Sequence, residues 1–218
     1  TAPNCVEYFI VRAACQCAGI IFFGLPVNLT PNEIAYFLDK TRAKILFYAK
    51  RGDFDINAVK VKTPLTHFVE LKSRLFAEIY SKTSTAPPGE LKIPNQLATF
   101  NLSSATTQRI PKIIQLSDSN WIASLYGYLK NSTARLNKEN VFLCAVPYLT
   151  AGSTTFLPSL VAGLTCIVVK EDIAAGPMVS YIKKYKVNRL YITPSRLIEL
   201  VSWCQANNQR LKSLESII

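Results

Sequence analysis

The feature that most constrains the fold of this chain is a repeated switch between short apolar runs and longer amphipathic stretches. The short runs have the length of buried strands, whereas the longer stretches repeat their apolar residues at helical spacing. Strands and helices that alternate in this way, with short links between them, are typical of a parallel sheet covered by helices. The sequence therefore predicts an α/β fold with mostly parallel sheets.

The predicted elements cover most of the chain. Strands are predicted over residues 20–23, 44–48, 66–71, 98–102, 113–116, 141–146, 165–169 and 187–192. Helices are predicted over residues 6–18, 30–39, 55–60, 118–130, 156–161, 177–185 and 194–206, the first of them largely buried. Two helix starts carry capping signals: Thr30 with Pro31 and Glu33, and the Ser-Asp-Ser-Asn run at 117–120.

A polar, proline-rich stretch interrupts the alternation near the middle of the chain. Residues 81–95 contain Ser, Thr and Pro-Pro-Gly with little hydrophobicity, which is typical of an exposed loop. We therefore expect a first α/β lobe over residues 1–80, a linker or loop over 81–96, and a second α/β lobe over 97–218. Residues 214–218 look like a strand that is beginning to pair, so we expect the chain to continue in a longer protein.

Composition favours a folded protein without a membrane span. Hydrophobic residues make up 49% of the chain and charged residues 18%, which predicts a substantial buried core. No apolar run reaches the roughly 18 residues of a membrane span, and Glu7 and Arg12 do not fit a signal peptide. The six cysteines lie mostly among apolar neighbours, which favours reduced thiols in a cytoplasmic protein over disulfides or a metal site. His67, the only histidine, excludes a multi-histidine metal site.

The net charge of +11 raises the question of nucleic-acid binding. The Lys and Arg residues, however, are spread along the whole chain, and no basic stripe interleaved with aromatic residues is present. The charge is therefore interpreted as a solvated surface, and no specific nucleic-acid partner is predicted.

The stretch that carries chemistry is 99–120, TFNLSSATTQRIPKIIQLSDSN. A predicted strand enters a hydroxyl-rich turn at 103–107, and Pro111-Lys112 follow just before the next strand. Hydroxyls and backbone N–H groups in a tight turn can surround phosphate oxygens, and a nearby Lys adds a positive charge. By itself, a Ser/Thr run before a Lys is more often an ordinary polar loop.

With its flanking strands, this stretch resembles the phosphate-binding motif of the adenylate-forming (AMP-binding) enzymes, the superfamily of acyl-CoA synthetases and firefly luciferase. The motif is usually written Ser-Gly-Thr-Thr-Gly-x-Pro-Lys-Gly. The resemblance continues through residues 114–120, where Asp118 replaces the usual His. It assigns the following residues to the phosphates of ATP: Ser103, Ser104, Thr106, Thr107, Gln108 and Lys112.

Other segments match the same family in the right order. Residues 4–20 resemble its early helix, and residues 28–46 resemble its segment around the conserved Glu, here Glu33. Residues 160–165 match Leu-x-x-Gly-x-Thr, and residues 182–200 match the segment that contains Tyr-Lys-Val and a later Pro. The resemblance implies an acyl pocket near Tyr148, Thr150 and Ala151, with Thr150 where the family usually has His. The fold it implies is an incomplete adenylate-forming N-terminal domain.

The phosphate motif departs from the family pattern at its glycines. Ala105 and Gln108 replace two of them, Ile113 replaces a third, and one residue is inserted before Pro111. Glycine serves where the backbone approaches phosphate closely or takes a positive φ, so these changes predict a weakened site. The family's metal-linked Glu, its ribose-binding Asp and its catalytic Lys have no counterpart in these 218 residues.

The resemblance implies a function for the parent protein. That protein would activate a small-molecule carboxylate with ATP, giving an acyl-adenylate and pyrophosphate, and then transfer the acyl group to CoA. Mg²⁺ and CoA are expected only in the complete parent, and this chain alone is expected to be inactive. The alternative is a non-catalytic, degenerate homologue that keeps the fold. A cytoplasmic location is expected, with a peroxisomal one as the alternative.

Overall fold

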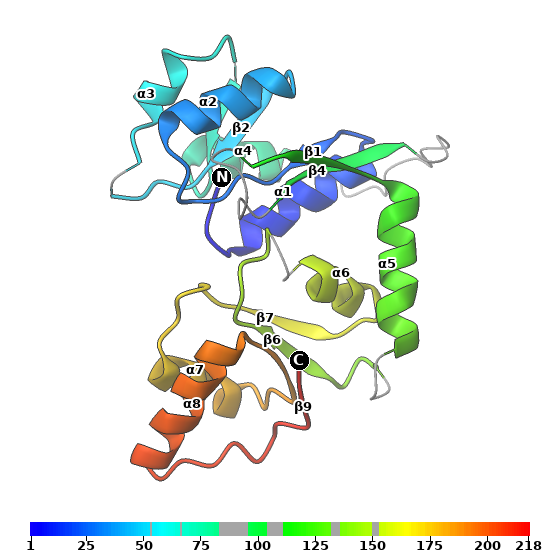
Figure 1. Cartoon of the computed structure of the whole chain (residues 1–218), viewed down its shortest axis with the longest axis vertical. Coiled ribbons are helices and arrows are strands. Elements are labelled where there is room, and N and C mark those ends of the chain that lie inside the picture. The colour runs from blue at the N-terminus through cyan, green and yellow to red at the C-terminus, as the bar shows by residue number, and fades with distance from the viewer. Residues whose placement is uncertain (53, 66, 83–95, 104–110, 132–135, 150–152) are drawn as a thin grey trace. The chain divides into compact units, whose positions relative to one another are not determined.

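The computed structural model describes the chain except for residues 53, 66, 83–95, 104–110, 132–135 and 150–152, and except for the side chains of 153–155 (Figure 1). The described residues form two compact units, Thr1–Leu116 and Ser117–Ile218. The division lies beyond the predicted linker at 81–96, most of which falls outside the described residues. The reason is strand pairing: Phe22 and Phe23 pair with Thr99 and Phe100, so the strand after the polar stretch belongs to the first unit.

The first unit has two small sheets and four helices among its described residues. Its helices are α1 (Val6–Cys17), α2 (Pro31–Lys40), α3 (Ile56–Lys60) and α4 (Arg74–Ser81). One sheet pairs β2 (Ile45–Tyr48) with β3 (His67–Glu70) in parallel. The other has the order β1-β4-β5, from β1 (Phe22–Phe23), β4 (Leu97–Leu102) and β5 (Ile113–Ser117), with β1 and β4 parallel.

Both faces of β2 are covered, because its side chains alternate between two apolar clusters. Leu46 packs with Ile34 and Phe37 of α2 and with Val59 of α3. The next residue, Phe47, belongs to a second cluster, which is made by the chain's first residues, α1 and the start of α4. Side chains of β2 thus pack on both faces of the strand, as expected of a parallel strand, while Ile45 at its start is exposed.

The second unit contains a four-stranded parallel sheet in the order β7-β6-β8-β9. Its strands are β6 (Val141–Cys144), β7 (Thr165–Val168), β8 (Arg189–Tyr191) and β9 (Ser216–Ile217). Its helices are α5 (Asp118–Asn131), α6 (Ser153–Val161), α7 (Ala175–Lys184) and α8 (Pro194–Ala206).

Helices also cover both faces of this sheet (Figure 1). Leu143 of β6 packs with Met178 and Ile182 of α7 and with Leu200 of α8. On the opposite face, the Phe142 ring lies 6.4 Å from the ring of Phe156 in α6, measured between centroids. The predicted α/β fold with mostly parallel sheets is therefore confirmed.

Local capping signals gave the right helix starts. Thr30 Oγ1 accepts the N–H of Glu33, and the Glu33 carboxylate accepts the N–H of Thr30, which is the predicted capping box. The hydroxyl of Ser117 and the side chain of Asn120 cap α5 in the same reciprocal way. Short-range hydrogen bonds of this kind depend only on residues three apart, so the sequence reveals them directly.

One prediction about helices needs correction, and one helix was missed. The helix over residues 6–18 exists, but only three of its residues, Tyr8, Val11 and Arg12, are buried, because α1 turns a single stripe toward the core. Helix α4 was not predicted at all. Its signals were Ser73, whose hydroxyl accepts the N–H of Phe76, and the apolar pair Leu75 and Ile79.

In the part of the chain that the structure describes, no helix is long and apolar enough to cross a membrane.

Candidate functional site

The candidate phosphate site lies where β4 ends and β5 begins, in the first unit. Ser103 follows β4 directly, and Lys112 immediately precedes β5. Their backbones are joined, since the N–H of Ser103 donates to the carbonyl of Lys112 at 2.9 Å. A second bond runs the other way, from the N–H of Lys112 to the side-chain oxygen of Ser103, also at 2.9 Å. Strands at both ends of the predicted strand-turn-strand connection are thus confirmed, and their ends are tied together.

Ser103 and Lys112 form the base of this connection, which we call the stem. Their side chains differ in exposure. Ser103 is half-buried, whereas Lys112 is exposed to solvent. The ammonium of Lys112 is therefore free of the core and available to an anion. The other predicted phosphate contacts, Ser104, Thr106, Thr107 and Gln108, lie outside the described residues.

Ser103 has a role in the structure that the sequence did not reveal. The family resemblance assigns its hydroxyl to phosphate, but its Oγ accepts a backbone N–H from a residue nine positions away. No short-range pattern signals this bond, because it depends on the pairing of β4 and β5.

The predicted acyl pocket falls partly within the second unit. Tyr148, just after β6, is 1% exposed, and its ring packs on Phe156 of α6 with a centroid distance of 4.8 Å. Burial raises the pKa of the Tyr148 hydroxyl well above its ordinary value. The other two predicted pocket residues, Thr150 and Ala151, lie outside the described residues. Tyr148 as described is thus a core residue, and its part in an acyl pocket stays a prediction.

The thiol of Cys166 lies near this core, and its pKa bears on whether it can act as a nucleophile. Burial, together with the neighbouring Cys144, raises the pKa of Cys166 to about 12. A thiol with such a pKa is almost entirely protonated at neutral pH, and the thiolate is the reactive form. The raised pKa therefore does not favour Cys166 as a nucleophile.

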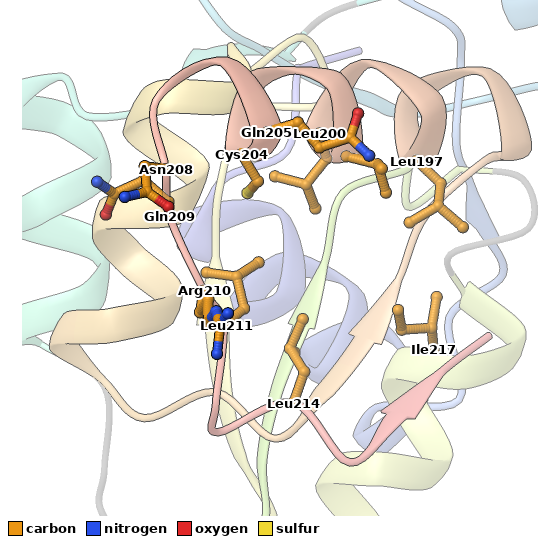
Figure 2. A pocket seen from close by; sticks show the side chains of 11 residues that line it. Leu197, Leu200, Cys204, Gln205, Asn208, Gln209, Arg210, Leu211, Leu214 and Ile217 are labelled. Atoms are coloured by element: carbon orange, nitrogen blue, oxygen red, sulfur yellow. The ribbon is translucent and has the colours of Figure 1, made fainter.

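The second unit holds a cavity of about 330 Å³ between α8 and the segment that leads into β9 (Figure 2). Its walls are mainly aliphatic, with Leu197, Leu200 and Leu211 pointing into it, while Gln209 and Arg210 lie at its edge. Neither Lys112 nor Tyr148 lines it. The cavity therefore contains neither of these predicted site residues, and we do not assign the candidate site to it.

Among the described residues, no three His, Cys, Asp or Glu side chains gather into a group that could hold a metal ion. The chemistry available at the stem is therefore that of one exposed ammonium, on a backbone held by two hydrogen bonds. Such a group can offset the negative charge of a phosphate.

Solved structures of adenylate-forming enzymes share this fold. The chain matches a Mycobacterium tuberculosis fatty acyl CoA synthetase at a TM-score of 0.87 and 16% identity, over 99% of this chain and 42% of that one. It matches an anthranilate CoA ligase in complex with anthranoyl-AMP at 0.85 and 20%, over 99% and 42%. It also matches an o-succinylbenzoate CoA synthetase from Bacillus subtilis, in complex with its acyl-adenylate intermediate, at 0.79 and 17%, over 100% and 53%. The chain thus spans about half, or less, of the length of these proteins.

A comparison with protein families gives the same assignment by an independent route. The AMP-binding enzyme family matches residues 1–218, which is the whole chain. At identities of 16 to 20%, the structural matches establish the fold, and the family match establishes descent. This chain belongs to the AMP-binding enzyme family.

Proposed function

We propose that the parent protein activates a small-molecule carboxylate with ATP and then transfers the acyl group to CoA. In the first step a carboxylate oxygen attacks the α-phosphorus of ATP, and pyrophosphate leaves. The observation that carries the proposal is the closed stem, which holds the exposed Lys112 at the end of a hydroxyl-rich loop. The 218-residue chain contributes the phosphate-binding part and is not expected to turn over alone.

In this proposal Lys112 acts by its charge. Phosphoryl and adenylyl transfer need positive groups placed in advance near the phosphate oxygens, and an ammonium on a fixed backbone meets that need. Mg²⁺ binds to carboxylate oxygens and phosphates. Among the described residues, no three His, Cys, Asp or Glu side chains form a group that could hold a metal ion. We assign Mg²⁺ to the complete parent and derive no step through it.

The relatives support carboxylate activation as the reaction class. An anthranoyl-AMP and an o-succinylbenzoyl-adenylate are the molecules bound in two of the matching structures, and both are carboxylates joined to AMP. Their acids differ in size and charge. We therefore propose the class of substrate and not an individual acid. We also propose a cytoplasmic location.

A second candidate function is a non-catalytic homologue that keeps the fold. The observation that favours it is the presence of Ala105 and Gln108 at two positions where the family motif is usually written with glycine. Side chains at these positions obstruct the close approach of backbone to phosphate.

The test is ATP binding by the 218-residue chain, measured by calorimetry at millimolar ATP. We compare wild type, Lys112→Ala, and the double variant Ala105→Gly/Gln108→Gly. Lys82→Ala serves as the matched control, because Lys82 is also an exposed lysine of the first unit and lies outside the predicted site. A charge-assisted contact is worth about 1.5–3 kcal/mol, so Lys112→Ala should weaken binding about tenfold to a hundredfold.

The outcomes separate the two candidates. Binding that weakens in Lys112→Ala and not in Lys82→Ala supports a working phosphate site. Binding only after glycine is restored indicates a decayed loop on an intact scaffold. If no variant binds ATP, the phosphate-site proposal is wrong and the fold-only homologue remains.

A further inference from the structure

We infer that Ser103 is a positioning residue that fixes the backbone of Lys112. The inference rests on the proposed function, because it concerns the same phosphate site. It gives Ser103 a positioning role in that site. It also predicts that a substitution at Ser103 changes phosphate binding through Lys112.

The geometry of the stem carries the inference. In a hydrogen-bonded pair of a regular antiparallel ladder, the two facing residues exchange both of their backbone hydrogen bonds. Ser103 and Lys112 exchange one such bond, from the N–H of Ser103 to the carbonyl of Lys112. The return bond, from the N–H of Lys112, ends on the Ser103 side-chain oxygen at 2.9 Å. The hydroxyl therefore takes the place that a backbone carbonyl holds in the regular pair.

The residue before Lys112 makes this bond more important. Pro111 has no backbone N–H and cannot donate to the opposite strand. The amide of Lys112 is consequently the first donor available where the chain enters β5. Without the Ser103 hydroxyl, one hydrogen bond would remain between these two residues, and the backbone from which the Lys112 ammonium projects would be less constrained.

The hydrogen bond from the Lys112 N–H also fixes the direction of the Ser103 side chain, which points toward the Lys112 backbone. Oγ lies within hydrogen-bonding distance of the Lys112 amide, and the residue is half-buried, whereas Lys112 is exposed. An anion that meets the exposed ammonium needs no contact with Ser103. Because the Ser103 hydroxyl holds the backbone of Lys112, we expect its effect on phosphate binding to pass through Lys112.

The first arm of the test needs no ligand. Amide hydrogen exchange at residue 112 is followed by NMR in the 218-residue chain. Loss of one hydrogen bond in Ser103→Ala should speed exchange at this amide by about two- to tenfold. Ser103→Thr keeps an Oγ and should retain the protection. Ser81→Ala is the control, since the Ser81 hydroxyl also bonds the backbone, at the end of α4, and should leave residue 112 unchanged.

The second arm is a double-mutant cycle on binding of inorganic tripolyphosphate, measured by calorimetry. Ser103→Ala should weaken binding in wild type by about two- to tenfold and have no effect in the Lys112→Ala background, because residues that act through one another are not additive. Ser103→Thr should restore the affinity of wild type.

The two arms keep the failure of the inference distinct from the failure of the proposed function. Unchanged exchange at residue 112 in Ser103→Ala overturns the inference, and so does a cycle in which the two substitutions add, because that result makes Ser103 a direct ligand. If wild type does not bind tripolyphosphate, the proposed phosphate site is wrong, while faster exchange at residue 112 still supports the positioning of Lys112 by Ser103.

Discussion

Replacing Asn188 tests how the sheet of the second unit is held together. Asn188 precedes β8 and touches two neighbouring strands. Its side-chain Oδ1 accepts the N–H of Val141 at 2.9 Å, and its own N–H donates to the Val141 carbonyl at 3.1 Å. Its carbonyl accepts the N–H groups of Glu215 and Ser216 just before and within β9. Asn188→Ala removes only the side-chain acceptor and leaves the backbone bonds in place.

The expected cost follows from the partner left behind. A buried N–H without an acceptor costs about 1–3 kcal/mol, and this N–H is only half-buried, so we expect the lower part of that range, about 1–2 kcal/mol. For a unit of about 100 residues, each kcal/mol lowers the melting temperature by roughly 4–8 °C. Asn188→Asp keeps an oxygen at the same place and should stay within about 0.5 kcal/mol of wild type.

The assay is urea unfolding followed by tryptophan fluorescence. Both tryptophans of the chain, Trp121 in α5 and Trp203 in α8, belong to the second unit, so the signal reports that unit. If Asn188→Ala is as stable as wild type, or if Asn188→Asp loses as much as Asn188→Ala, the side-chain bond to Val141 does not stabilise the sheet, and the reasoning is refuted.

Four further predictions concern a helix cap, a carboxylate, two helical glycines and the cysteines. Thr30→Ala, which breaks the capping box of α2, should cost about 1 kcal/mol in thermal denaturation followed by circular dichroism; an unchanged melting temperature would contradict the cap. Hydrogen bonds from the Thr30 N–H and hydroxyl lower the pKa of Glu33. The contribution of its carboxylate to folding stability is therefore fully present above pH 4.5, the ordinary pKa, and is lost as pH falls through the lowered pKa. The difference in stability between wild type and Glu33→Gln should shrink in that pH range. Gly127→Ala adds a Cβ that meets nothing within 4 Å, and it should stabilise α5 by about 0.5–1 kcal/mol. Gly176→Ala puts a Cβ 3.1 Å from the Trp203 ring, so it should stabilise the protein less or destabilise it. Equal effects of the two substitutions in urea unfolding would refute the close packing of Gly176 on Trp203. Thiol titration of the denatured, non-reduced chain should find six free thiols, and two or fewer would contradict the assignment of reduced cysteines.

The sequence alone determined the elements whose causes are local. The capping box at Thr30 and the Ser117–Asn120 cap depend on side chains that reach backbone groups three residues away, so the residue types suffice to place these helix starts. The order of strands and helices followed from the switch in apolar spacing, which was enough to predict parallel sheets. The family resemblance came instead from the motif at 103–120 and from the other matching segments. Helix α4 was missed, although Ser73 supplies the same kind of local capping signal at its start.

Only the tertiary structure decided which segments meet. The pairing of Phe22 with Thr99 joins residues far apart in the chain, and it moved the division between the units past the polar stretch that the sequence suggested. In the same way, Tyr148 became a core residue on Phe156, and the Ser103 hydroxyl found the amide of Lys112. These contacts arise from strand pairing and helix packing between distant segments, and the energy of such contacts leaves no pattern within a short window of sequence.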